Sequence, residues 1–162
     1  MINVLASNAY QNLTLSHIAD AVDLNHKQIR QYYSDYGTVL FDVLNVISMS
    51  YLREMFSALP PLDETLPHKN KQWVFELLLI RLQAFFASEL GRAFISIYRQ
   101  FEIDARFERL LHAIKTEWYE MLQIELAQIG MKYKAYDAFN HCFICAYQVY
   151  NNHATDSACT VH

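Results

Sequence analysis

The sequence predicts an all-α fold, and three observations support this class. Glycine and proline occur only three times each in 162 residues, which leaves long stretches free of helix-breaking residues. Apolar residues recur every three or four positions along most of these stretches, which is the spacing of one face of an α-helix. In addition, 53% of the residues are hydrophobic, so the chain contains enough apolar material for a sizeable core.

The first expected elements are short helices. Residues 2–8 are predicted to form the first of them. Thr14 or Ser16 can cap a second helix, whose inner side carries apolar residues. The segment Asp23-Leu24-Asn25 is predicted to form a tight turn, because Asp and Asn favour turns and tolerate left-handed backbone.

A third short helix and a long fourth helix should follow. The third is expected over residues 26–33, with Asn25 as its N-cap and with Ile29 and Tyr33 turned inward. The fourth is expected to run from about residue 38 to residue 58. Its apolar stripe consists of Leu40, Val43, Leu44, Ile47, Tyr51 and Met55.

The rest of the chain is predicted to form a helical body. The expected helices cover residues 68–87, 90–103, 105–129 and 134–152. The first of these is apolar on almost all sides from Val74 to Phe86, which predicts extensive burial. Gly130 is well placed to end the third. The last ten residues have little periodicity and are expected to form a frayed tail.

The charge of the N-terminal region is unusual for a domain that binds nucleic acid. The whole chain has a net charge of −4, and residues 1–56 contain three basic side chains against five acidic ones. A nucleic-acid-binding domain normally presents a positive surface. This region would do so only if His17 and His26 became protonated near phosphates.

Short motifs between residues 2 and 44 nevertheless follow one known order. Ala9-Tyr10 is followed by Thr14-Leu15 and Ile18-Ala19, then by the turn at residues 22–25, and then by a short helix with inward Ile29 and Tyr33. In this order the segment resembles the N-terminal domain of the tetracycline-repressor (TetR) family of bacterial regulators. The sequence departs from the family pattern at Asp23 (usually Gly), Arg30 (usually Tyr) and Tyr36 (usually Lys), and it lacks the family's basic N-terminal arm.

The resemblance implies a helix-turn-helix DNA-binding domain over residues 1–44 and a helical effector-binding and dimerisation domain over residues 45–162, joined by a long linker helix. The third helix would enter the major groove, where Gln pairs with adenine and Lys with guanine. The base-reading candidates are His26, Lys27 and Gln28. The phosphate-contacting candidates are Thr14, Arg30, Gln31 and Tyr32. The alternative interpretation is that these residues are the solvated face of a small helix.

The resemblance also implies that the helical body binds a small apolar or aromatic effector. The candidate pocket residues are Trp73, Leu77, Phe85, Tyr98, Phe101, Phe107, Leu111 and Trp118. The alternative is that they simply fill the core, as stripes at helical spacing usually do. Arg81 and Gln83 interrupt an apolar run, so each needs a partner or water. One of them could orient a ligand, or it could form a structural salt bridge.

The segment His141-Cys142-Phe143-Ile144-Cys145 combines a Cys-x-x-Cys motif with a neighbouring histidine. A structural zinc site needs about four ligands, and here only the tail residues His153, Cys159 and His162 could complete it. Redox-active pairs usually lie at a helix N-terminus, whereas this pair falls in mid-helix. We therefore interpret both cysteines as buried, inert thiols and expect no metal or cofactor. The sequence also lacks motifs that would indicate an enzyme.

Together these features predict a ligand-responsive DNA-binding transcriptional regulator, a repressor, that acts as a homodimer on double-stranded operator DNA. The aromatic face of residues 135–150 is the expected dimer surface. The alternative is a helical ligand- or protein-binding module of the same fold that has lost DNA binding. No run of eighteen apolar residues and no apolar signal core occurs, so a cytoplasmic protein without membrane contact is expected.

Overall fold

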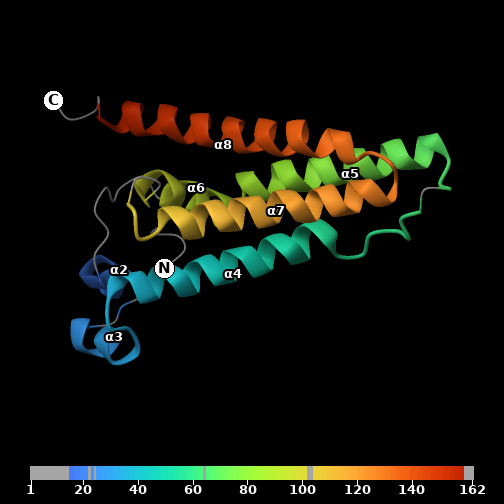
Figure 1. Cartoon of the computed structure of the whole chain (residues 1–162). Helices are drawn as coiled ribbons and strands as arrows, with labels where there is room; N and C mark the ends of the chain where they lie inside the picture. Colours follow the sequence, from blue (N-terminus) through green and yellow to red (C-terminus); the bar gives the residue numbers. More distant parts are fainter. Residues whose placement is uncertain (1–14, 22, 24, 64, 102–103, 159–162) are drawn as a thin grey trace.

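The structure is a computed structural model that describes residues 15–21, 23, 25–63, 65–101 and 104–158 (Figure 1). The described residues form helices and connecting turns without any strand, which confirms the all-α class. The predicted helix over residues 2–8 lies outside this set. Over the part of the chain that the structure describes, every helix is too short or too polar to cross a bilayer.

The helices follow the predicted order, and α5 has the predicted range. The elements are α2 (Leu15–Ala21), α3 (His26–Tyr32), α4 (Tyr36–Phe56), α5 (His68–Ala87), α6 (Glu89–Phe101), α7 (Glu108–Gln128), the 3₁₀ turn η1 (Lys132–Lys134) and α8 (Ala135–Ala158). Figure 1 shows α4, α5, α7 and α8 running along one bundle, with α2 and α3 at the end where α4 begins.

Hydrogen bonds of two aspartates explain why two helices begin at residues other than those predicted. The carboxylate of Asp35 accepts a hydrogen bond from the backbone N–H of Thr38 at 3.0 Å, so α4 begins two residues earlier than expected. Asp104 delays α7, because its carboxylate accepts from the N–H of Arg106 at 3.0 Å and its carbonyl accepts from the N–H of Phe107 at 2.9 Å. These bonds close a turn where the sequence predicted the first residues of α7.

The ends of α7 and α8 differ in how well the sequence predicted them. Gly130 follows α7 with a φ of 72°, a left-handed conformation that suits glycine. The N–H of Met131 then donates to the carbonyl of Leu126 at 2.8 Å, which confirms the predicted stop. The prediction of a frayed tail is wrong for residues 153–158, because α8 continues to residue 158. No glycine or proline interrupts this segment.

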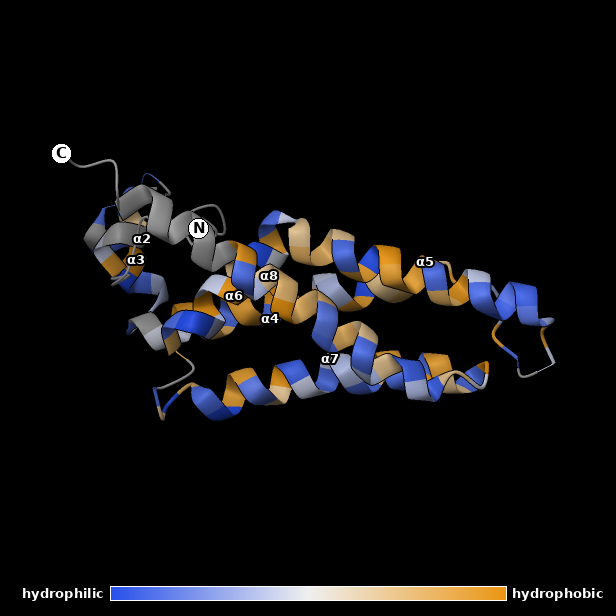
Figure 2. Cartoon of the chain, turned by 90° about the horizontal axis from the view of Figure 1, so that it is seen from above, coloured by the Kyte–Doolittle hydropathy of each residue, from blue (hydrophilic) through white to orange (hydrophobic). Residues whose placement is uncertain are grey.

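Helix α6 lies in the interior of the bundle. Its buried residues are Gly91, Ala93, Phe94, Ile95, Ser96, Ile97, Tyr98 and Phe101. Figure 2 shows both hydrophobic and hydrophilic residues along the other long helices. The bundle therefore shields the apolar surface of α6 with one face of each surrounding helix.

The centre of the core is aromatic. Tyr51 of α4 and Trp118 of α7 stack with ring centroids 4.4 Å apart, and the Tyr51 hydroxyl donates to the Trp118 carbonyl at 3.2 Å. The indole N–H of Trp118 donates to the Ser48 hydroxyl at 3.0 Å. Phe85 and Phe94 pack on the same indole at 5.4 and 4.4 Å. These contacts satisfy the polar atoms of both large side chains and join α4 to α7.

The buried residues of the N-terminal helices belong to the same hydrophobic cluster as the body. Ala19 of α2 and Ile29 of α3 are 1% and 2% exposed, and they join Val39 and Leu40 of α4 in this cluster. Helices α2 and α3 are therefore held by apolar packing at the start of α4, and this packing determines which side of α3 faces solvent.

Candidate functional site

The turn between α2 and α3 has the geometry that its sequence predicts. Asp23 has a φ of 54°, so it adopts a left-handed backbone conformation, which Asp tolerates better than most residues. Asn25 is the N-cap of α3, as predicted. Its side chain accepts a hydrogen bond from the backbone N–H of Gln28 at 2.9 Å. These two residues fix the direction in which α3 leaves the turn.

The outward face of α3 is polar and exposed. Its described exposed side chains are Lys27, Gln28, Arg30, Gln31 and Tyr32. On the opposite side, Ile29 is buried as predicted, and Tyr33 is half-buried just after the helix. Thr14 and the side chain of His26 lie outside the described residues. The helix thus presents most of the predicted contact residues to solvent and is held by the predicted apolar residue.

Gln28 has a second role that the sequence analysis missed. Its side-chain Oε1 accepts a hydrogen bond from the backbone N–H of Asn25 at 2.9 Å, which completes a reciprocal capping box. Bidentate pairing with adenine needs both the oxygen and the nitrogen of the amide. The oxygen is already engaged here, so Lys27 is the better placed base-reading candidate. The Asn-x-x-Gln spacing was the signal for this capping box.

Acidic side chains outnumber basic ones near this exposed face. Asp20, Asp23 and Asp35 are all exposed near α3, against the two exposed cations Lys27 and Arg30. These side chains carry a formal charge of −1, so the described surface of α2 and α3 lacks the excess of positive charge expected for DNA binding.

The junction between α3 and α4 is organised by polar contacts. Burial raises the pKa of Tyr33, and the charge of Asp42 and a hydrogen bond to it raise that pKa further. The pKa of Asp35 is lowered, first by the backbone N–H of Thr38 and then by the Ser34 hydroxyl. The contacts that cause these two pKa shifts join residues just after α3 to the first turns of α4.

The start of α4 also lies against the body of the protein. A methyl group at Gly37 would be 3.4 Å from the ring of Phe107, in the segment before α7. The Phe107 ring packs in turn on Phe101 at the end of α6, with centroids 5.1 Å apart. The Phe107 ring therefore lies between the start of α4 and the end of α6.

The predicted pocket residues lie at different depths. Phe85, Leu111 and Trp118 are at most 1% exposed, whereas Trp73 is 54% exposed on the outside of α5. Tyr98 and Phe101 are buried, and Leu77 and Phe107 are half-buried. Phe85 and Trp118 pack directly on each other. The buried members therefore fill the core in this structure, and Trp73 faces away from them.

Arg81 and Gln83 have ordinary structural environments. The guanidinium of Arg81 donates from Nη1 to the carbonyls of Met55 and Ser57 at 2.9 and 2.8 Å. These carbonyls lie at the C-terminus of α4, where a positive charge is favourable. Gln83 is exposed to water. The partner that the sequence required for Arg81 is thus the end of a neighbouring helix.

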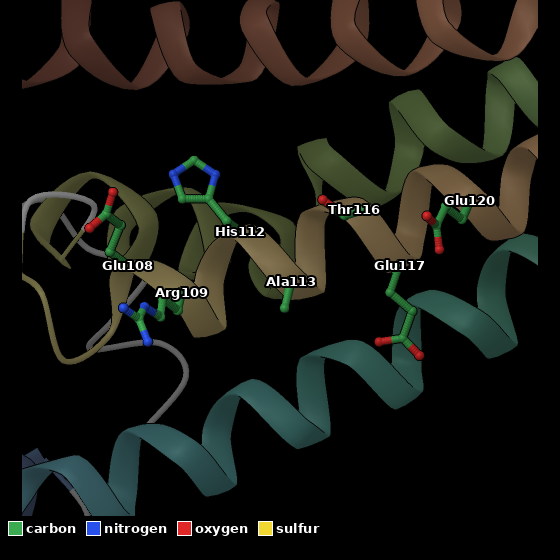
Figure 3. Close-up of a pocket in the computed structure, with 7 residues that line it drawn as sticks. All are labelled: Glu108, Arg109, His112, Ala113, Thr116, Glu117 and Glu120. Carbon is green, nitrogen blue, oxygen red and sulfur yellow. The ribbon is translucent and has the colours of Figure 1, made fainter.

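One shallow depression lies on the surface of α7, and another lies where α7 is followed by η1 and α8. One, of about 570 Å³, is lined by Glu108, Arg109, His112, Ala113, Thr116, Glu117 and Glu120. Figure 3 shows that all these side chains come from α7, so facing helices do not enclose this depression. The other, of about 510 Å³, is lined by Tyr119, Gln123, Ala127, Gly130, Lys132, Tyr133 and Tyr136. Neither depression contains any of the eight predicted pocket residues.

The two central cysteines differ in exposure. Cys142 is buried as predicted, but the prediction is wrong for Cys145, which is exposed. Residues three apart on an α-helix are about 60° apart around its axis, so Cys145 falls beyond the edge of the buried face. The Sγ of Cys145 lies 3.7 Å from Nε2 of the exposed His141.

Comparisons of this chain with protein-family models, with curated proteins and with solved structures found no match.

Proposed function

We propose that this protein is a homodimeric, ligand-responsive regulator that binds double-stranded DNA through α3, with α2 and α3 forming a helix-turn-helix and α4 acting as its linker to the body. The single observation that carries the proposal is the orientation of α3. Ile29 is buried beneath it, while Lys27, Arg30 and Gln31 all face solvent. A helix that reads the major groove must be supported from behind and exposed in front.

The exposed residues divide into two roles by their position on α3. Lys27 lies in the first turn, and N-terminal residues of a recognition helix reach base edges. Arg30, Gln31 and Tyr32 lie nearer the end of the helix and would contact phosphates. Gln28 would read a base only by exchanging its hydrogen bond with Asn25 for one with DNA. Thr14 and His26 keep their predicted roles as part of this proposal.

Effector binding would act through α4. The ring of Phe107 connects the beginning of α4 to α6 and α7, so a ligand that separates these helices would shift the two α3 helices of a dimer. Half-site spacing must match the helical repeat of DNA, and a small shift would therefore release it. The proposed effector is apolar or aromatic. It would have to enter among side chains that pack together in this structure.

A second candidate function is supported by the charge balance of α2 and α3. Three exposed aspartates outnumber two exposed cations here, which is unfavourable for an interface with phosphates. In this alternative the chain is a helical ligand- or protein-binding module that keeps the fold and does not bind DNA.

Selection of bound duplexes from a random pool at low salt, with the full chain immobilised, separates the two functions. The proposal predicts enrichment of a sequence with two related half-sites, and release of that duplex by at least one apolar ligand from a panel. Retention of no duplex above an unrelated acidic protein would refute DNA binding and support the binding-module function.

A further inference from the structure

An exposed histidine–cysteine pair lies on the outer side of α8. His141 and Cys145 are one helical turn apart, and both are exposed. Their Nε2 and Sγ atoms are 3.7 Å apart. In a tetrahedral zinc site, bonds of about 2.0 Å to nitrogen and 2.3 Å to sulfur place these two atoms about 3.5 Å apart. The pair is therefore spaced like two neighbouring ligands of one ion, without any change of backbone.

One chain supplies only half of such a site. Among the described residues, no group of three or more His, Cys, Asp or Glu side chains could hold a metal ion. Cys142 is buried, so it cannot turn to this surface. A structural zinc site needs about four ligands. The two missing ligands can come from the same pair in a second copy, since a two-fold axis beside α8 would bring two histidines and two cysteines together.

The surface around the pair suits contact with that second copy. Ile144 and Val149 are 50% and 56% exposed on α8, beside the pair. Their burial between two copies would be favourable. Two thiolates would balance the charge of a divalent ion, and each thiol would release its proton to solvent on binding.

We propose that His141 and Cys145 from two chains bind one zinc ion, or another divalent ion that prefers nitrogen and sulfur ligands, between paired α8 helices. The ion would fix the register of the dimer. This site is independent of DNA binding, since its residues lie on α8 and not on α2 or α3.

The test uses the full, reduced, metal-free chain titrated with cobalt(II) as the probe. The proposal predicts the visible bands of tetrahedral cobalt and a thiolate charge-transfer band, with saturation at one cobalt per two chains. Sedimentation at dilutions where the metal-free chain is monomeric should show a dimer that forms with the same stoichiometry, and zinc should displace the cobalt.

Matched variants identify the ligands. Cys145→Ser and His141→Ala should each weaken cobalt binding by about tenfold or more and abolish the metal-dependent dimer. Cys142→Ala removes the neighbouring buried thiol, and His112→Ala removes an exposed histidine of α7. Both controls should keep the full signal, and circular dichroism should show a folded helical protein in every variant. Saturation at one ion per chain, or a signal unchanged by Cys145→Ser, would overturn the proposal.

Discussion

At the scale of single residues, the side chains around the α2–α3 turn show what local chemistry determines. Asp23 adopts left-handed backbone, and Asn25 caps α3. Both were predictable, because these residue types favour such positions through short side-chain hydrogen bonds. The return bond from Gln28 to the Asn25 N–H followed from the same spacing rule, but it competes with the base-reading role that the sequence suggested.

A buried thiol should make stability depend on pH. Burial raises the pKa of Cys142 to about 11, and the nearby Cys145 adds to this shift. In the unfolded chain the thiol ionises at lower pH, so the unfolded state holds fewer protons than the native state between about pH 9 and pH 11. The contribution to stability is complete below the unfolded pKa and is lost as pH rises through the folded pKa.

Urea unfolding of the reduced, metal-free protein at several pH values measures this effect. We expect the contribution of Cys142 to the free energy of unfolding to fall by at most about 1.4 kcal/mol per pH unit in this range. In Cys142→Ala the free energy of unfolding should fall less steeply with pH. In Cys145→Ala most of the wild-type decrease should remain. Burial also raises the pKa of Tyr51, so some loss above about pH 10 should persist in both variants. An identical slope in Cys142→Ala and the wild type would contradict this account.

At the scale of elements, the junction between α5 and α6 shows how closely two helices are packed. Helix α6 begins only two residues after α5 ends, and the Ser88 hydroxyl joins them by donating to the Phe85 carbonyl at 2.6 Å. The N–H of Gly91 donates to the same hydroxyl at 3.2 Å. This tight connection brings the backbone of α6 directly against the last turn of α5.

Gly91→Ala should therefore destabilise the protein. A Cβ atom at this position would lie 2.1 Å from the Phe85 carbonyl oxygen and 2.6 Å from the Cα of Phe86, so backbone must move. We expect a loss of about 1–3 kcal/mol in urea unfolding. Gly130→Asn is the control, since Gly130 has open space and asparagine tolerates left-handed backbone. Equal stability of the two variants would show that α6 can shift at little cost.

Arg81 should stabilise the end of α4. Because it donates to two C-terminal carbonyls, Arg81→Ala should lower the free energy of unfolding by about 1–2 kcal/mol. Arg81→Lys should recover only part of this loss, since an ammonium lacks the planar guanidinium. Gln83→Ala, two residues along α5 and exposed, should change stability by less than about 0.5 kcal/mol. If Arg81→Ala behaved like Gln83→Ala, these bonds would contribute nothing in solution.

The sequence predicted elements better than their faces. The range of α5 was predictable, because Pro67 and Ser88 flank a long run without breakers. The side of α5 that faces the core could not be predicted, since this helix is apolar on nearly every side. Periodicity then favours no particular face. Trp73 consequently turned out exposed, while Phe85 of the same helix is buried. The exposure of Cys145 was missed for a related reason, because a motif spacing of three residues straddles the edge of a buried stripe.

At the scale of the whole molecule, the N-terminal helices and the body form one connected structure. The buried residues of α2, α3 and α4 belong to the same hydrophobic cluster as those of the body. The ring of Phe107, in the segment before α7, lies beside Gly37 at the start of α4. The outward face of α3 could be predicted from local periodicity. A cavity could not, because it depends on how side chains from several helices fill the space between them.

If α3 binds DNA, removing positive charge from this helix should weaken DNA binding, whereas removing it from the body should not. The measurement is fluorescence anisotropy of a selected duplex at several salt concentrations. It compares the wild type with two double variants, Lys27→Ala/Arg30→Ala on α3 and Lys69→Ala/Arg109→Ala on the body. All four side chains are exposed and each pair removes the same charge, so general electrostatic attraction changes equally.

We expect the α3 variant to bind about tenfold or more weakly and to show a smaller salt dependence, because a base contact and a phosphate contact are lost. The body variant should bind nearly like the wild type. Equal weakening by both pairs, or no change in either, would contradict the claim that the exposed face of α3 binds DNA.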